Sequence, residues 1–169
     1  LESIGKMIDQ GDYFCINRGR QYGKTTMFSA LYRALKEKYF IIRLSFEDAG
    51  EDAYQSDKNF VNYFIHSISD FMEWTEVPEE LFSEWKTEEN LSEKTPFVHL
   101  SKKITRLCKK SEKEIILMID EVDKSSNNQI FLNFLGMLRN KYLKSREGLD
   151  ITFKSVILAG VYDIKNLKL

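Results

Sequence analysis

Apolar residues along this chain fall into two alternating patterns, short continuous runs and longer stripes at helical spacing. Four runs predict β-strands at residues 13–17, 39–46, 114–121 and 152–160. Runs with almost no polar residues are typical of strands that are covered on both faces, as in parallel sheets. We therefore expect a mostly parallel sheet.

Between these runs, apolar residues recur every three or four positions, which predicts amphipathic helices. The helices are expected near residues 1–10, 24–35, 59–74, 95–110 and 127–143, with a shorter one inside the acidic segment 75–94. Thr95 and Pro96 are suited to the N-cap and the first position of the fourth long helix. Strands that alternate with helices predict an α/β fold with right-handed crossovers.

Composition narrows the class of protein. The chain has 169 residues, of which 43% are hydrophobic and 30% charged, so we expect a single globular domain over residues 1–169. The net charge of −1 argues against a nucleic-acid footprint over the whole surface. One basic cluster is best interpreted as the exposed face of an amphipathic helix: Lys102, Lys103, Arg106, Lys109, Lys110 and Lys113.

The cysteines and the termini bear on localisation. Cys15 and Cys108 lie outside metal-ligand spacings and indicate reduced thiols in a cytoplasmic protein. No apolar run approaches the ~20 residues needed to cross a bilayer, so no membrane partner is expected. The chain starts with Leu1 rather than methionine, and we expect it to begin inside a longer gene product.

Residues 18–26, RGRQYGKTT, connect the first predicted strand to a long helix. A strand, a glycine turn and a helix start bind triphosphates, because backbone N–H groups and the helix N-terminus point at the anion. Lys24 would reach the β- and γ-phosphates as a catalytic and binding residue, and the Thr25 hydroxyl would bind Mg²⁺. The match to GxxxxGK[ST] is imperfect, since Arg18 takes the place of the first glycine. The predicted ATP contacts are Gly19, Arg20, Gln21, Tyr22, Gly23, Lys24, Thr25 and Thr26.

A second motif ends the third predicted strand, where the apolar run 115–119 leads into Asp120 and Glu121. Asp120 could bind Mg²⁺ directly or through water. Glu121, one residue later and on the opposite side of the pleat, could activate an attacking water as catalytic base. A strand that simply ends in solvated acids is the alternative, and the phosphate-loop pattern upstream favours the functional interpretation.

Residues 14–26 (FCINRGRQYGKTT) and 115–124 (IILMIDEVDK) resemble the bacterial AAA-like ATPase family of P-loop proteins, and segments 125–143 and 155–168 are also similar to it. The resemblance implies a three-layer P-loop fold with strand order 1-4-3-2. It also implies that Lys24 and Thr25 bind phosphate and Mg²⁺, and that Arg18 is a family trait. By the same resemblance, Asp120 is the metal acid and Glu121 the catalytic base.

The chain departs from the wider AAA class in two ways. That class usually carries a small polar residue at the end of the fourth strand, where this chain has Ala159, Gly160 and Val161. The nearest candidates are Tyr162 and Asp163. A fifth strand and a helical lid would lie beyond Leu169, so the chain is expected to be truncated before them.

These features favour a Mg²⁺-dependent ATPase that hydrolyses ATP to ADP and phosphate, coupled to an unknown process. A switch or scaffold that binds ATP with little hydrolysis is the alternative, favoured by the missing polar residue and opposed by Glu121. A small-molecule kinase would need an acceptor pocket and lid arginines. Besides ATP, candidate partners are a second copy of the chain and a C-terminal nuclease-like region of the same protein. The sequence leaves nucleic acid open as a partner.

Overall fold

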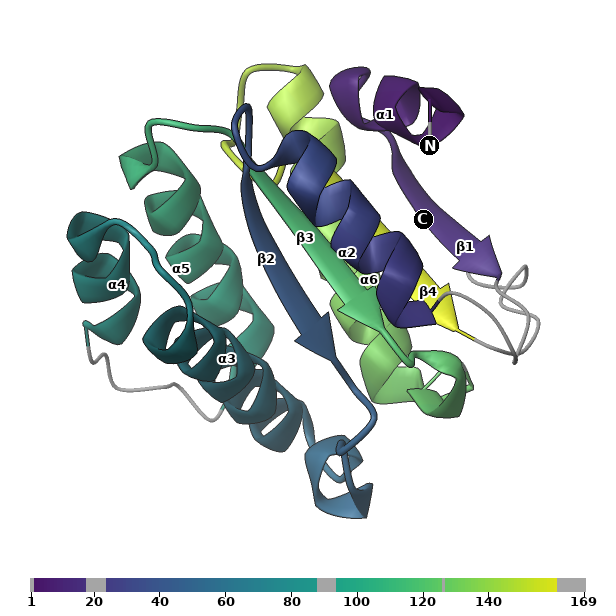
Figure 1. Ribbon diagram of the computed structural model, residues 1–169. Coiled ribbons are helices and arrows are strands. Elements are labelled where there is room, and N and C mark those ends of the chain that lie inside the picture. Colours follow the sequence, from purple (N-terminus) through teal and green to yellow (C-terminus); the bar gives the residue numbers. More distant parts are fainter. Residues whose placement is uncertain (1, 18–23, 88–93, 126, 161–169) are drawn as a thin grey trace. The chain divides into compact units, whose positions relative to one another are not determined.

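A computed structural model describes residues 2–17, 24–87, 94–125 and 127–160 (Figure 1). Contacts divide the chain into two compact units that alternate along the sequence. The first comprises residues 1–47, 113–126 and 153–169, and the second comprises residues 48–112 and 127–152. The single domain expected over residues 1–169 remains a prediction.

The first unit contains a four-stranded sheet in the order β1-β4-β3-β2. Its strands are β1 (Tyr13–Asn17), β2 (Phe40–Ser45), β3 (Ile115–Asp120) and β4 (Ser155–Gly160). All three neighbouring pairs are parallel. The α/β class, the parallel sheet and the order 1-4-3-2 are therefore confirmed, and the strand ends lie within three residues of those predicted.

Helices α1 (Glu2–Asp9) and α2 (Lys24–Leu35) pack on one face of this sheet (Figure 1). One buried cluster joins both helices to β2, β3 and β4: Ile8, Phe28, Leu31, Tyr39, Ile41, Ile116, Met118, Ile157 and Ala159. Burying a side chain such as Phe28 contributes about 1.5–3 kcal/mol to folding. Gly11, with a φ of 79°, supplies the left-handed conformation that ends α1 before β1.

The second unit is helical. It contains η1 (Glu51–Tyr54), α3 (Asp57–Trp74), α4 (Glu79–Lys86), α5 (Pro96–Lys110) and α6 (Gln129–Arg146). The Ser56 hydroxyl caps α3 by accepting a hydrogen bond from the Asn59 N–H at 3.0 Å. Thr95 takes the N-cap position of α5 and Pro96 the first helical position, both as predicted, although the Thr95 side chain makes no capping hydrogen bond.

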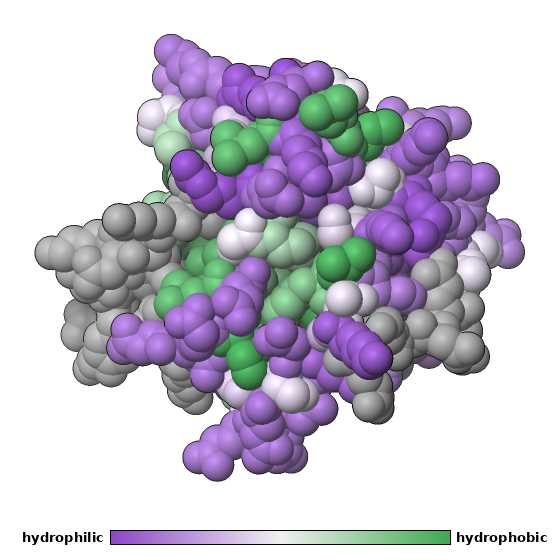
Figure 2. Space-filling model, turned by 180° about the vertical axis from the view of Figure 1, so that it is seen from behind, coloured by the Kyte–Doolittle hydropathy of each residue, from purple (hydrophilic) through white to green (hydrophobic). Residues whose placement is uncertain are grey.

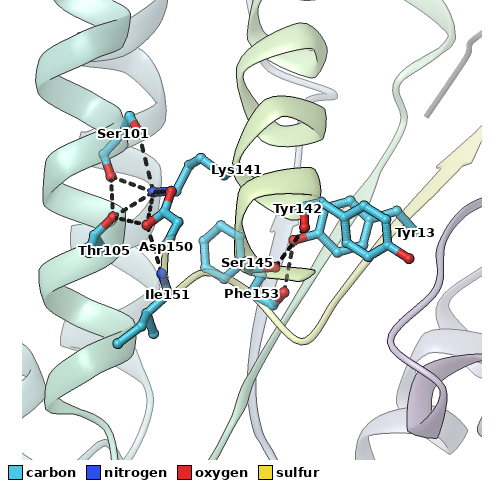
Figure 3. Close-up of polar contacts among 9 residues, drawn as sticks. All are labelled: Tyr13, Ser101, Thr105, Lys141, Tyr142, Ser145, Asp150, Ile151 and Phe153. Atoms are coloured by element: carbon cyan, nitrogen blue, oxygen red, sulfur yellow. Dashed lines mark hydrogen bonds and ion pairs between the residues drawn. The ribbon is translucent and has the colours of Figure 1, made fainter. Parts of the chain in front are cut away.

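A buried lysine ties three segments of the second unit together (Figure 3). Lys141 of α6 is 1% exposed. Its Nζ donates to the Ser101 carbonyl at 2.8 Å and to the Thr105 hydroxyl at 2.6 Å, and it forms an ion pair with Asp150 at 3.0 Å. Burial lowers the pKa of Lys141, and the hydrogen bond with Asp150 opposes this effect. The partners therefore offset part of the cost of burying the charge.

Lys103 is a second buried cation of this unit. It is 6% exposed and donates hydrogen bonds to the carbonyls of Trp85 and Thr87, at the C-terminal end of α4. The lysine thus satisfies carbonyls that the ending helix leaves without intrahelical partners. Interpreting the basic cluster of α5 as wholly exposed is therefore wrong for Lys103.

The surface mixes polar and apolar side chains, as the face in Figure 2 shows. Among the residues that the structure describes, the most exposed large apolar side chains are Trp74 and Leu149, at 87% and 70%. None of the described helices combines the length and the apolar character needed to cross a bilayer.

We predict that Asp150→Ala lowers the free energy of unfolding by about 3 kcal/mol, because it leaves the Lys141 charge buried without its counter-ion. Lys141→Met should cost less, since it removes the charge and nearly keeps the volume. Glu114→Ala is the control. It breaks an ion pair with Lys154 at 3.8 Å in which Glu114 is 64% exposed, and it should change little. Urea unfolding measures all three, and equal losses for Asp150→Ala and Glu114→Ala would contradict the assignment.

Candidate nucleotide site

The strand and the helix predicted to flank the phosphate loop are both present. Strand β1 ends at Asn17, and α2 begins at Lys24. The backbone of Lys24, Thr25 and Thr26 forms the first turn of this helix, where the partial positive charge of a helix N-terminus favours an anion. The remaining predicted loop contacts lie outside the described residues: Gly19, Arg20, Gln21, Tyr22 and Gly23.

Asp120 is the last residue of β3 and is paired in register with Ser45 of β2. Met118, two residues earlier, lies in the cluster beneath α2. Because side chains alternate along a strand, Asp120 projects from the face of the sheet that α2 covers. One of its carboxylate oxygens accepts a hydrogen bond from the Glu121 N–H at 2.8 Å, which restricts its orientation. The predicted metal acid and the predicted phosphate helix thus share one face of the sheet.

Glu121 differs from its predicted placement. It lies after β3, with a φ of 59°, and among the described residues it alone combines a side chain beyond hydrogen with a positive φ. The expectation that Glu121 continues the pleat on its opposite side is wrong, because the left-handed conformation turns the chain out of the strand. This conformation costs on the order of 1–2 kcal/mol for an L-residue. Such strain is common at functional sites.

The structure adds Arg43, a residue of a nearly apolar strand that was not among the predicted site residues. Arg43 lies on β2, and its Nη1 donates to the Ser29 hydroxyl of α2 at 3.4 Å. Its guanidinium lies over the Phe28 ring at 6.0 Å from the centroid. Burial lowers the pKa of Arg43, and attraction to Asp120 raises it. A permanent cation therefore offsets the charge of the carboxylate at the end of β3. A lone arginine inside an apolar strand was the pattern that could have revealed it.

The predicted oxygen donors suit a magnesium ion that is held partly by nucleotide phosphates, rather than a metal ion held by protein side chains alone. Within the described ranges, no group of three or more His, Cys, Asp or Glu side chains could hold a metal ion. Magnesium in nucleotide sites usually takes one or two carboxylates and completes its shell with phosphate oxygens and waters. Asp120, together with the Thr25 hydroxyl predicted from the sequence, matches that donor set.

Comparison with known families decides the class of the chain. A family profile described as an AAA-like domain matches residues 2–159. The chain belongs to the AAA-like domain family. A search of curated proteins finds no match. The matched region contains the predicted phosphate loop, Asp120 and Glu121, so membership in this AAA-like family indicates a nucleotide-binding domain of ATPase type.

The left-handed residue in this AAA-like domain gives a direct test of strain. We predict that Glu121→Gly is more stable to urea than Glu121→Ala by about 1 kcal/mol, because only glycine adopts the positive φ without steric cost. Both variants lack the carboxylate, so the comparison isolates the backbone. Equal unfolding free energies would mean that Glu121 carries no strain.

Proposed function

We propose that this chain binds ATP with Mg²⁺ and hydrolyses it to ADP and phosphate. The observation that carries the proposal is the placement of Asp120 on the α2 side of the sheet. Strand β4 separates β3 from β1, the strand that leads toward the predicted phosphate loop. Ligands of open parallel sheets bind at the carboxyl ends of the strands, where these features meet.

Each residue has a separate role in the proposed reaction. Backbone N–H groups of residues 19–23 and the Lys24 ammonium would hold the phosphates. The Thr25 hydroxyl and Asp120 would hold Mg²⁺, which offsets negative charge on the β- and γ-phosphates. Glu121 takes a proton from the attacking water. The restricted Asp120 and the strained Glu121 are consistent with a site arranged before the nucleotide arrives.

The second candidate is a switch or scaffold that binds ATP with little turnover. One observation favours it: β4 ends in Ala159 and Gly160, which carry no polar side chain.

A reducing, cytoplasmic location is proposed on the two free cysteines, Cys15 and Cys108. As partners we propose a second copy of the chain or a C-terminal nuclease-like region of the same protein, with nucleic acid left open.

We predict that Lys24→Ala weakens ATP binding by at least tenfold, because it removes a cation aimed at the β- and γ-phosphates. Titration with a fluorescent ATP analogue measures the affinity. Lys36→Ala is the matched control, because Lys36 follows the last residue of the same helix. Equal affinity in Lys24→Ala and the parent would overturn the nucleotide site.

We predict that Glu121→Gln binds ATP like the parent and loses at least a hundredfold in kcat, because an amide cannot accept the proton of the attacking water. Asp120→Asn should instead raise the Mg²⁺ concentration needed for half-maximal turnover. Phosphate release, measured against ATP and against Mg²⁺, separates the two effects. Parental turnover in Glu121→Gln would refute the catalytic-base assignment.

A further inference from the structure

The Asp123 side chain lies against Gly160, at the carboxyl end of β4. A Cβ added to Gly160 would collide with the Asp123 carboxylate, and it would also approach the Asp123 backbone nitrogen to 3.4 Å. Gly160 has no positive φ, so its lack of a side chain serves this close approach rather than an unusual backbone. A glycine at this position is therefore what admits the carboxylate.

Two backbone hydrogen bonds hold the segment around Asp123, one to the sheet and one within a turn. The Val122 N–H donates to the Ala159 carbonyl at 3.1 Å, which extends the pairing of β3 with β4 beyond the end of β3. Val122 is fully buried, and the Ser125 N–H closes a turn on the Val122 carbonyl at 2.9 Å. The short helix η2 (Asp123–Ser125) thus begins at a defined point beside Gly160.

Asp123 and Gly160 meet at the carboxyl end of β4, the strand that lies between the two predicted halves of the nucleotide site. Gly160 is paired in register with Asn17, the residue before the predicted phosphate loop. On its other side, β4 pairs with β3, whose last residue is Asp120. Strand β4 ends in Ala159 and Gly160, so a polar side chain there must come from another segment, and Asp123 provides one.

We propose that Asp123 is a further catalytic residue of the site, and that its carboxylate accepts a hydrogen bond from the water that attacks the γ-phosphate. The proposal rests on the proposed ATPase function. Gly160 then acts as a positioning residue, because its missing side chain keeps the Asp123 carboxylate at the end of β4.

The chemistry of the group fits this assignment. An ionised carboxylate only accepts hydrogen bonds, and close contact with phosphate oxygens would be repulsive, so its partner at a triphosphate must be a hydrogen-bond donor or a cation. In the reaction, the water oxygen bonds to the γ-phosphorus, the bond between that phosphorus and the β–γ bridging oxygen breaks, and the proton passes to Glu121. Asp123 fixes the direction of the water lone pair and transfers no proton itself.

A double-mutant cycle in the whole protein tests the inference through four forms: parent, Gly160→Ala, Asp123→Ala, and the double variant. We expect each single variant to lose at least tenfold in kcat, with ATP affinity and the Mg²⁺ half-saturation within twofold of the parent. Since Gly160→Ala acts by displacing the carboxylate, adding it to Asp123→Ala should cost less than threefold more. Asp123→Asn keeps the shape and an acceptor oxygen, so it should retain more turnover than Asp123→Ala.

Two controls separate a catalytic role from a structural one. Gly136→Ala is the matched glycine substitution, because Gly136 lies on α6 with nothing within 4 Å of an added Cβ. It should leave kcat unchanged. Urea unfolding of every variant shows whether each is folded under the assay conditions. If Gly160→Ala does not fold, Asp123→Asn and Asp123→Ala alone decide the proposal through kcat at unchanged ATP affinity.

Several results would overturn the inference. Parental kcat in Asp123→Ala would do so, and so would losses that multiply independently in the double variant. A raised Mg²⁺ half-saturation at unchanged kcat would assign Asp123 to the metal shell instead. Lys24→Ala distinguishes this failure from failure of the proposed function. If Lys24→Ala loses ATP while the Asp123 variants keep parental turnover, only the inference about Asp123 is wrong. If Lys24→Ala binds ATP normally, the nucleotide site itself is wrong.

Discussion

The insertion of β4 between β1 and β3 is the constraint on which the candidate site depends. The last strand in sequence pairs with the first and the third, and all of its residues are buried. Two strand spacings of about 4.8 Å each set a separation of about 10 Å between the ends of β1 and β3. This separation leaves room for phosphate groups between the predicted loop and Asp120. Without β4, the two motifs would have no fixed distance between them.

Interior cations are the second recurrent feature, and each is held by specific partners. Arg43 contacts Ser29 and offsets the charge of Asp120 in the first unit. In the second unit, Lys103 donates to carbonyls at the C-terminal end of α4, and Lys141 donates to the Ser101 carbonyl and pairs with the Asp150 carboxylate. A buried cation contributes little net stability, but removing its partner is costly. These contacts therefore favour one arrangement of the segments over others.

The segment after β3 is where local preference and tertiary structure disagree. Glu121 adopts a conformation that glycine would adopt at lower cost, while Gly160 stands in a strand that would otherwise favour a β-branched residue. Both exceptions lie at the carboxyl ends of neighbouring strands, β3 and β4. The first turns the chain out of β3, and the second admits the Asp123 carboxylate at the end of β4. Departures of this kind are expected at functional sites, where geometry outweighs local stability.

The sequence by itself determined the elements and the class of the chain. Apolar runs placed all four strands, helical spacing placed the helices, and the motifs around Lys24 and Asp120 identified the AAA-like family. These features are local, so a linear pattern contains them. The tertiary structure alone decided the left-handed Glu121, the burial of Lys141 and Lys103, the proximity of Arg43 to Asp120, and the contact between Asp123 and Gly160. Strand pairing brings Arg43 near Asp120 and Asp123 near Gly160, whereas packing of α4, α5 and α6 buries the two lysines. Glu121 depends on a backbone turn that no periodicity encodes.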